Sequence, residues 1–138
     1  MQVSYPANIT EQADGSYLVQ FIDLPDTFTE GQTMDEALFN ASEVLSGMLC
    51  WHVDQGHDVI PATLGAKKAH YIAPDAKTQA ALLLRQARGD RTHADLARAL
   101  STSWPQAKRL ESASYWPNLK TLDRAAAALG KRLMISFA

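Results

Sequence analysis

The polar side chains between residues 103 and 109 are of the types that read DNA. In a major groove, Gln and Arg can each form paired hydrogen bonds with a base edge, and Lys and Ser suit bases or phosphates. On a short helix, this spacing would project Ser103, Trp104, Gln106, Lys108 and Arg109 from its start and its outer face. Trp104 has two interpretations: it packs on a sugar or a thymine methyl group, or it holds the recognition helix to the next helix. The stretch predicts a base-reading surface.

Further basic and polar residues precede this stretch. Arg88, Arg91 and Arg98 are expected to flank the groove and to meet phosphates, which adds affinity without choosing a sequence. Thr92 and His93 begin the preceding helix and are assigned to the same DNA-facing set.

No arrangement of residues predicts catalysis. Cys50 and His52 are two positions apart, which on a helix prevents them from facing each other, so Cys50 is interpreted as a small buried hydrophobe. His52, His57 and His70 lack metal-ligand spacing and a nucleophile partner. A metal-dependent nuclease would need converging carboxylates, and the first predicted strand contains none. We expect no enzyme activity, no metal and no cofactor.

Charge divides the chain into two halves of opposite sign. Residues 1–73 hold two lysines against ten acidic residues, a net charge of −8, whereas residues 74–138 hold eleven Lys and Arg against five acids, a net of +6. One explanation is that charged residues are distributed unevenly by chance over two solvent-exposed surfaces. The other is that the two halves bind partners of opposite charge. The single cysteine, the start "MQVSYPANIT" and the lack of an apolar run of ~18 residues favour a cytoplasmic protein with no membrane contact.

Residues 1–73 predict a small sheet with one helix. Alternating apolar residues indicate a strand over 3–9, where Pro6 suggests an edge position or a bulge. Asp14-Gly15 predicts a hairpin turn into a strand over 17–24, with a brief strand near Phe28. Thr33 and Glu36 form a capping-box pattern for a helix that extends as far as Gln55. Residues 58–68 are loop-like, and 69–73 predict one more strand.

Residues 74–138, which begin at Pro74, predict four helices and a strand. The expected helix starts are Asp75, Thr92, Ser103 and Asn118; Thr92 and Ser103 carry capping-box patterns with Asp95 and Gln106. The second and third helices are joined by residues 100–102, which is helix-turn-helix geometry. A single such unit reads a half-site, so we expect at least a dimer. The apolar alternation over 131–138 predicts a terminal strand, which pairs between subunits because an open edge is a liability.

The second half resembles the Cro/repressor helix-turn-helix family. The resemblance covers residues 78–130 and is carried by Leu96-Ala97, Arg109-Leu110-Glu111 and the closing helix "NLKTLDRAAAALG". His93 stands where the family usually has Gln, and Ser101 stands at the usual Gly of the turn. These departures predict a lost backbone contact to phosphate and slight strain in the turn.

The whole chain resembles the HicB antitoxin family. The matching motifs are Tyr-Pro in the first strand, Asp-Gly-Ser-Tyr at the hairpin, Asp-Leu-Pro after the second strand, Gly-x-Thr-x-x-Glu-Ala entering the helix and the closing "ALGKRLMISF". The resemblance implies an α+β chain, with a partial RNase H-like domain over 1–73 and an all-α helix-turn-helix domain with a C-terminal strand over 74–138. It also implies a basic HicA-type partner, an mRNA ribonuclease toxin, and binding to double-stranded operator DNA of the chain's own operon.

The acidic half is expected to cover that toxin. We assign tentative toxin contacts to Asp23, Asp26 and Glu30, with Phe21 and Phe28 as aromatic anchors; Trp51 is a further anchor candidate. Each aromatic has the alternative of a core position. Two rival functions remain: a one-component transcriptional regulator whose first domain senses a ligand, and a vestigial ribonuclease, which the missing strand carboxylate disfavours.

Overall fold

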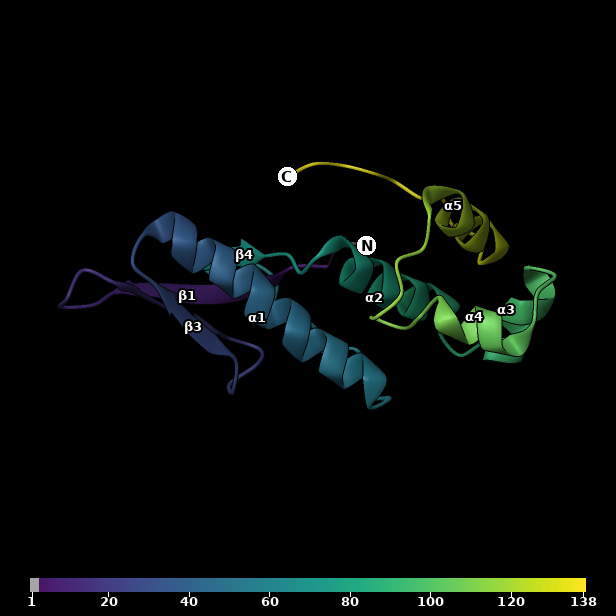
Figure 1. The fold of residues 1–138 in the computed structure, drawn as a ribbon, viewed down its shortest axis with the longest axis horizontal. Helices are drawn as coiled ribbons and strands as arrows, with labels where there is room; N and C mark the ends of the chain where they lie inside the picture. The colour runs from purple at the N-terminus through teal and green to yellow at the C-terminus, as the bar shows by residue number, and fades with distance from the viewer. Residues whose placement is uncertain (1–2) are drawn as a thin grey trace.

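The computed structural model describes residues 3–138 and begins with a four-stranded antiparallel sheet. Its strands are β1 (Tyr5–Glu11), β2 (Tyr17–Phe21), β3 (Phe28–Gly31) and β4 (His70–Ile72), in the order β3-β2-β1-β4. All four strands were predicted, and β1 begins two residues later than expected. The hairpin turn is confirmed, because Gly15 has a φ of +86° and the Asp14 carboxylate accepts from the backbone N–H of Ser16 at 3.0 Å. The sheet lies at one end of an elongated molecule (Figure 1).

Pro6 is not at an edge of the sheet. It lies in β1, between β2 and β4, and is opposite Tyr71. Its carbonyl accepts from the N–H of Ile22, just after β2, at 3.0 Å. The nitrogen and the carbonyl of one strand residue point to the same side, so the nitrogen of Pro6 also faces β2, where the β1–β2 ladder ends. A missing N–H costs little at the end of a ladder, which is why an interior strand tolerates this proline.

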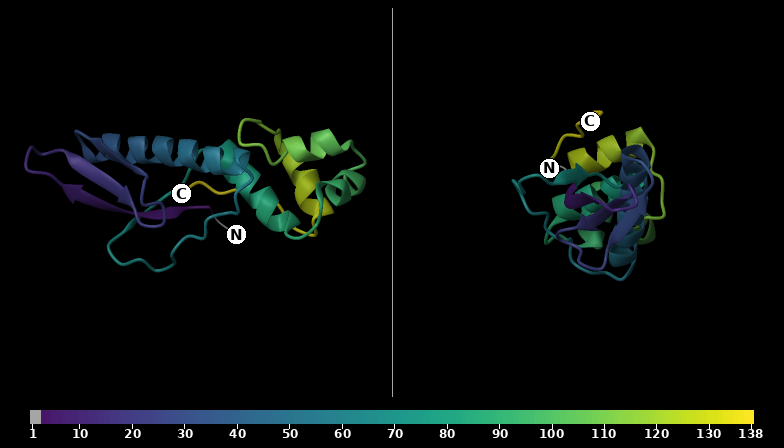
Figure 2. Two further views of the ribbon diagram at one scale, coloured as in Figure 1. Left: turned by 90° about the horizontal axis from the view of Figure 1, so that it is seen from below. Right: turned by 90° about the vertical axis from the view of Figure 1, so that its left-hand side faces the viewer.

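The long helix α1 (Met34–Asp54) packs on one face of the sheet (Figure 2). Thr33 caps it by accepting from the N–H of Glu36 at 3.1 Å. Ala37, Ala41, Leu45 and Leu49 are buried against the apolar side chains of β1 and β2. Gly31 allows β3 to approach closely, because an added Cβ would stand 2.3 Å from the nitrogen of Ala37. This packing is the first core.

Four shorter helices form the second half: α2 (Ala76–Arg88), α3 (His93–Ala99), α4 (Trp104–Arg109) and α5 (Leu119–Ala128). Each begins at a predicted cap, whose side chain accepts a backbone N–H three residues further on; the caps are Asp75, Thr92, Ser103 and Asn118. Thr92 and Asp95 complete a reciprocal capping box. In α4 the Gln106 side chain bonds to the Thr102 hydroxyl. The second core contains Leu84, Leu96, Ala97, Ala107, Leu110, Ala125 and Leu129.

Helix α2 belongs to both cores. Leu82 is buried with the residues of the sheet and α1, whereas Leu84 is buried with those of α3, α4 and α5. The Ser46 hydroxyl of α1 also accepts from the backbone N–H of Asp75 at 2.8 Å. The change of composition at Pro74 therefore precedes a helix that the two halves share.

The predicted terminal strand is not formed in the single chain. Residues 131–138 form no strand; Leu133 is half-buried, and the other large apolar side chains are exposed, with Met134 at 84%, Ile135 at 64% and Phe137 at 102%. The tail leaves α5 and turns back towards the middle of the molecule (Figure 1). Alternation alone does not make a strand, because a strand needs an edge with which to pair.

Candidate functional site

A tight turn joins α3 to α4. The N–H of Thr102 donates to the carbonyl of Ala97 at 2.9 Å, and Ser101 has a φ of +52°, in the left-handed region that favours glycine. Ala97 and Ala107 are both buried, and their small side chains let the two helices approach closely. The strain expected at Ser101 therefore has a structural basis in its backbone conformation.

The side chains predicted to read bases are gathered on α4 and on Ser103, the residue that caps it. Ser103, Trp104, Gln106, Lys108 and Arg109 are all exposed. The Trp104 ring is 49% exposed, lies edge-on to His93 with centroids 6.1 Å apart, and has the Lys108 Nζ 5.0 Å from its centroid. Lys108 makes a cation–π contact with the indole of Trp104. The exposed half of Trp104 remains available to a partner.

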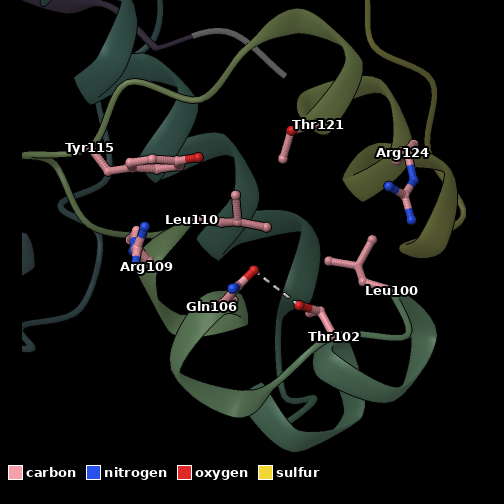
Figure 3. Close-up of a pocket in the computed structure, with 8 residues that line it drawn as sticks. All are labelled: Leu100, Thr102, Gln106, Arg109, Leu110, Tyr115, Thr121 and Arg124. Carbon is pink, nitrogen blue, oxygen red and sulfur yellow. Dashed lines mark hydrogen bonds between the residues drawn. The ribbon is translucent and has the colours of Figure 1, made fainter.

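A hollow of about 170 Å³ lies beside α4 (Figure 3). Gln106 and Arg109 line it from α4, and Thr121 and Arg124 line it from α5. The Arg109 guanidinium lies 5.6 Å from the centroid of the Tyr115 ring. Among the described residues, no acidic side chain lines the hollow. Thr121 and Arg124 were not predicted as site residues, although their spacing of three places them on the same face of α5.

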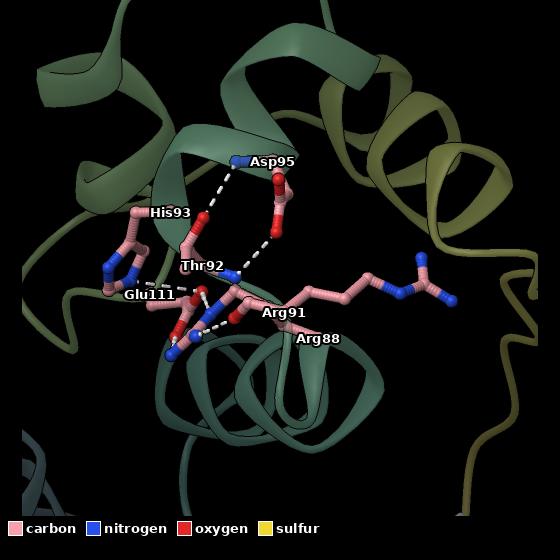
Figure 4. A network of polar contacts seen from close by, with 6 residues as sticks. All are labelled: Arg88, Arg91, Thr92, His93, Asp95 and Glu111. Carbon is pink, nitrogen blue, oxygen red and sulfur yellow. Dashed lines mark hydrogen bonds and ion pairs between the residues drawn. The ribbon is translucent and has the colours of Figure 1, made fainter.

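Arg88 does not face the surface of α4. Its Nε lies 2.6 Å from Oε2 of Glu111 and its Nη2 lies 3.0 Å from Oε1, while Nη1 donates to the carbonyl of Arg91 (Figure 4). The two side chains are 15% and 6% exposed. The structure thus assigns Arg88 to an internal ion pair, which corrects its expected place at the phosphates. Sequence alone does not show that Glu111, whose carboxylate is buried, needs this partner.

His93 and Thr92 are also engaged within the fold. The His93 Nε2 lies 3.3 Å from Oε2 of Glu111, and the Thr92 hydroxyl accepts from the N–H of Asp95 at 3.1 Å. The hydrogen bonds from the Thr92 N–H and hydroxyl lower the pKa of the Asp95 carboxyl. Arg98 pairs with Asp95 on the surface. Arg91 extends away from this network (Figure 4) and is exposed.

The first half carries a groove of about 760 Å³, larger than the hollow beside α4. The connection from β2 to β3 forms one wall and the last turns of α1 form the other, with Ile60 contributing from the loop before β4. Asp23 and Asp26 line it, together with Trp51, which is 51% exposed. The Asp23 carboxylate accepts from the Thr63 hydroxyl at 2.6 Å and from its N–H at 2.9 Å, which fixes this wall.

The other predicted toxin contacts lie away from the groove. Phe21 is 1% exposed and belongs to the first core, so it cannot anchor a partner, and its prediction as a contact is wrong. Phe28 and Glu30 lie exposed on β3, outside the groove lining. An alternating strand pattern shows which residues share a face but not which face is covered, and α1 covers the face that carries Phe21.

Two histidines lie beside Trp51. The Nδ1 atoms of His52 and His57 are 2.9 Å apart, and both rings meet Trp51 edge-on. Burial is the larger cause that lowers the pKa of His52, and the nearby His57 is the smaller one.

Within residues 3–138, no three His, Cys, Asp or Glu side chains are grouped so that they could hold a metal ion. No helix in this described part is long and apolar enough to cross a membrane.

Comparison with known proteins places the sequence in one family. Residues 4–74 match the family model described as "HicB_like antitoxin of bacterial toxin-antitoxin system". The chain belongs to the HicB-like antitoxin family. Its relatives include antitoxin HicB of Escherichia coli K12, 27% identical over 95% of this chain and 96% of that protein. Antitoxin HicB 2 of Photorhabdus laumondii is 31% identical over 94% of this chain and 92% of its own length.

This HicB-family chain also has a solved structural relative. The N-terminal domain of Burkholderia pseudomallei antitoxin HicB shares 24% identity with it, covers 53% of this chain and 99% of its own, and superimposes with a TM-score of 0.47. Antitoxins of the HicB family are not enzymes, which agrees with the expectation of no enzyme activity. The two full-length relatives extend across both halves, so the antitoxin resemblance includes the helices that follow residue 74.

Proposed function

We propose that this HicB-family antitoxin neutralises a small basic HicA-type mRNA ribonuclease with its first half and represses its own operon with its second half. The observation that carries the proposal is the separation of charge over two surfaces. A half with a net charge of −8 bears the groove, and a half with +6 bears the exposed polar side chains of α4. Opposite charges speed the encounter of each half with its partner.

The toxin surface is proposed in the first half because an enzyme that cleaves RNA must attract phosphates. Its surface is therefore expected to be basic and to complement an acidic domain. Asp23 and Asp26 lie beside exposed apolar surface, which is the arrangement that gives affinity as well as attraction. Glu30 and Phe28, both exposed on β3, are assigned to the periphery of this surface, where charge affects mainly the association rate.

The DNA surface is proposed on α3 and α4, which act as a helix-turn-helix. Gln106 and Arg109 read base edges, and Ser103, Trp104 and Lys108 complete the contact with bases and backbone. Arg91 supplies a phosphate contact near the start of α3, where Thr92 and His93 hold that end in place. Arg88 contributes indirectly, through its ion pair with Glu111.

The assembly is proposed to be at least a dimer. A helix-turn-helix reads half of a symmetric operator, so two copies are needed. Leu133, Ile135 and Phe137 alternate along residues 131–138; Ile135 and Phe137 are exposed, and pairing of two such tails as strands would cover them. The proposed compartment is the cytoplasm, because both proposed partners, the mRNA ribonuclease and the operator DNA, are expected there.

One experiment tests both halves of the proposal. The full-length chain is co-expressed with the protein encoded beside it and purified at low salt, and its binding to the promoter duplex is compared with binding to a random duplex. We expect a stoichiometric basic partner that stops growth when expressed alone, and a preference for the promoter. A chain that binds neither contradicts the proposal.

A second candidate function is a one-component regulator, because the groove of about 760 Å³ lies within the size range of small-molecule sites. This function predicts operator affinity that changes with a small ligand in the absence of any protein partner. Repression that depends on the protein partner alone excludes it.

A further inference from the structure

The groove of the first half has an acidic wall, the connection between β2 and β3, which carries Asp23 and Asp26. Val44 and Met48 of α1 and Ile60 add apolar lining. Trp51 also lines the groove and has half of its surface open to solvent. Among the described residues, no Lys or Arg lines this groove. A complementary occupant carries an apolar side chain with a basic side chain next to it.

The wall is rigid enough to hold a partner. Both carboxylate oxygens of Asp23 are bound by Thr63, forty residues away, and the Thr27 N–H donates to the carbonyl of Leu24 at 2.9 Å. The opposite wall is the continuous helix α1. Preformed walls reduce the ordering cost of association, which favours an anchor inserted from outside.

We infer that this groove receives an apolar anchor of the toxin, with a basic toxin residue against Asp26. The inference rests on the proposed antitoxin function and adds where the toxin sits. Tryptophans that become fully covered at the centre of an interface carry a large share of binding energy, and Trp51 is placed to do so. The acidic net charge of this half fits a basic partner better than a neutral metabolite. Phe28 and Glu30 then lie outside the contact centre.

Gly47 offers a way to block the groove without disturbing the core. It lines the groove from α1, and an added Cβ there would meet nothing within 4 Å. Replacing a helical glycine also favours the helix intrinsically. Gly47→Trp therefore fills the space that the toxin anchor needs. Gly47→Ala is the matched variant with the same backbone effect and little volume, and Phe39→Ala removes an aromatic side chain that is 66% exposed elsewhere on α1.

The test is the affinity of each full-length variant for the toxin encoded beside the chain, in a catalytically inactive form. We expect Gly47→Trp to weaken binding at least about tenfold. Gly47→Ala and Phe39→Ala should bind as the unaltered chain does, and Gly47→Trp should keep its melting temperature. Normal binding by a folded Gly47→Trp overturns the groove assignment and leaves the antitoxin function standing. No binding by the unaltered chain overturns both.

A second measurement does not depend on the packing of a new side chain. With Trp104 and Trp116 replaced by Phe, Trp51 is the one remaining tryptophan of the three. The fluorescence emission of Trp51 should shift to shorter wavelength on toxin binding, because the toxin would cover the ring and exclude water from it. In the same background, Asp26→Lys should slow association about tenfold or more at low salt. Unchanged Trp51 emission in a formed complex contradicts the inference.

Discussion

Arg88 holds the buried carboxylate of Glu111 with two hydrogen bonds, of 2.6 and 3.0 Å, and thereby ties the end of α2 to the segment just after α4. The pair thus joins the helix that both cores share to the chain just after the helix whose surface we assign to DNA. It shows why a basic residue near a recognition helix is not by itself a DNA contact.

The ion pair should control stability. Arg88→Met or Glu111→Leu alone leaves the partner charge buried, so each should lower the free energy of unfolding by about 3 kcal/mol. The double variant should lose less than the sum, because neither charge remains. Urea unfolding followed by circular dichroism gives these values. If Arg88→Met is fully stable but binds every duplex weakly, Arg88 is a phosphate contact after all.

Gln106 and Arg109 should determine which operator is read. Replacing either by Ala removes a base contact and should reduce the preference for the operator by about 1–3 kcal/mol, while toxin affinity stays unchanged. Fluorescence anisotropy with operator and random duplexes measures this. The matched variant is Arg91→Ala, which should weaken both duplexes alike and reduce the salt slope by about one. A uniform loss on Arg109→Ala would place that residue among the phosphate contacts.

Ser101 should be replaceable by glycine with a gain in stability. Its φ of +52° disfavours any side chain with a Cβ, so Ser101→Gly should stabilise the chain by about 0.5–1 kcal/mol, net of the extra freedom of the unfolded glycine. Ala99→Gly, at the last residue of α3, should destabilise it, by up to about 1 kcal/mol. Thermal melts of the two variants compare the signs. A loss on both would mean that the turn imposes no strain on Ser101.

The tail should matter for DNA more than for the toxin. Deletion of residues 131–138 removes the exposed apolar side chains that we propose to pair between subunits, and leaves the groove intact. Light scattering should show a smaller assembly, and operator affinity should fall while toxin affinity holds. An equal loss of both affinities would contradict the assignment of the tail to dimerisation.

Acid should weaken the start of α3 through Asp95. Hydrogen bonds from Thr92 lower the pKa of this carboxyl below its ordinary value of 3.8, so its contribution to stability is present above that pH and is lost as the pH falls through the lowered pKa. Asp95→Asn should therefore flatten the dependence of the melting temperature on pH below pH 3.8. The same change on a Thr92→Val background should have a smaller effect. An identical effect on both backgrounds would exclude Thr92 as the cause.

Local patterns predicted most elements and their starts. Asp75, Thr92, Ser103 and Asn118 act as caps because a cap depends on a side chain and an N–H three residues away, both visible in the sequence. The tail, the interior place of Pro6 and the burial of Phe21 depend on pairing between distant segments. A periodicity contains no information on which edge or face is taken.

The candidate site was predicted in the same uneven way. The exposed residues of α4 follow from helix spacing and are confirmed as exposed, whereas their binding of DNA stays a prediction. Arg88 was misplaced because its partner Glu111 is 23 positions away. The groove itself was not predicted, although three of its lining residues were. Asp23 and Asp26 were candidate toxin contacts because of their charge and Trp51 because of its size, and α1 and the β2–β3 connection bring them together.

The sharing of α2 limits how such antitoxins can be recombined. Leu82 and Leu84 lie two positions apart on one helix, yet each completes a different core. In a chimera joined at Pro74, Leu82 would be separated from the sheet and α1 against which it packs. Exchange of the proposed DNA specificity between relatives should succeed when the graft begins after α2, at Gly89. The helix α2 then stays with the first half, and only its later turns need a compatible neighbour.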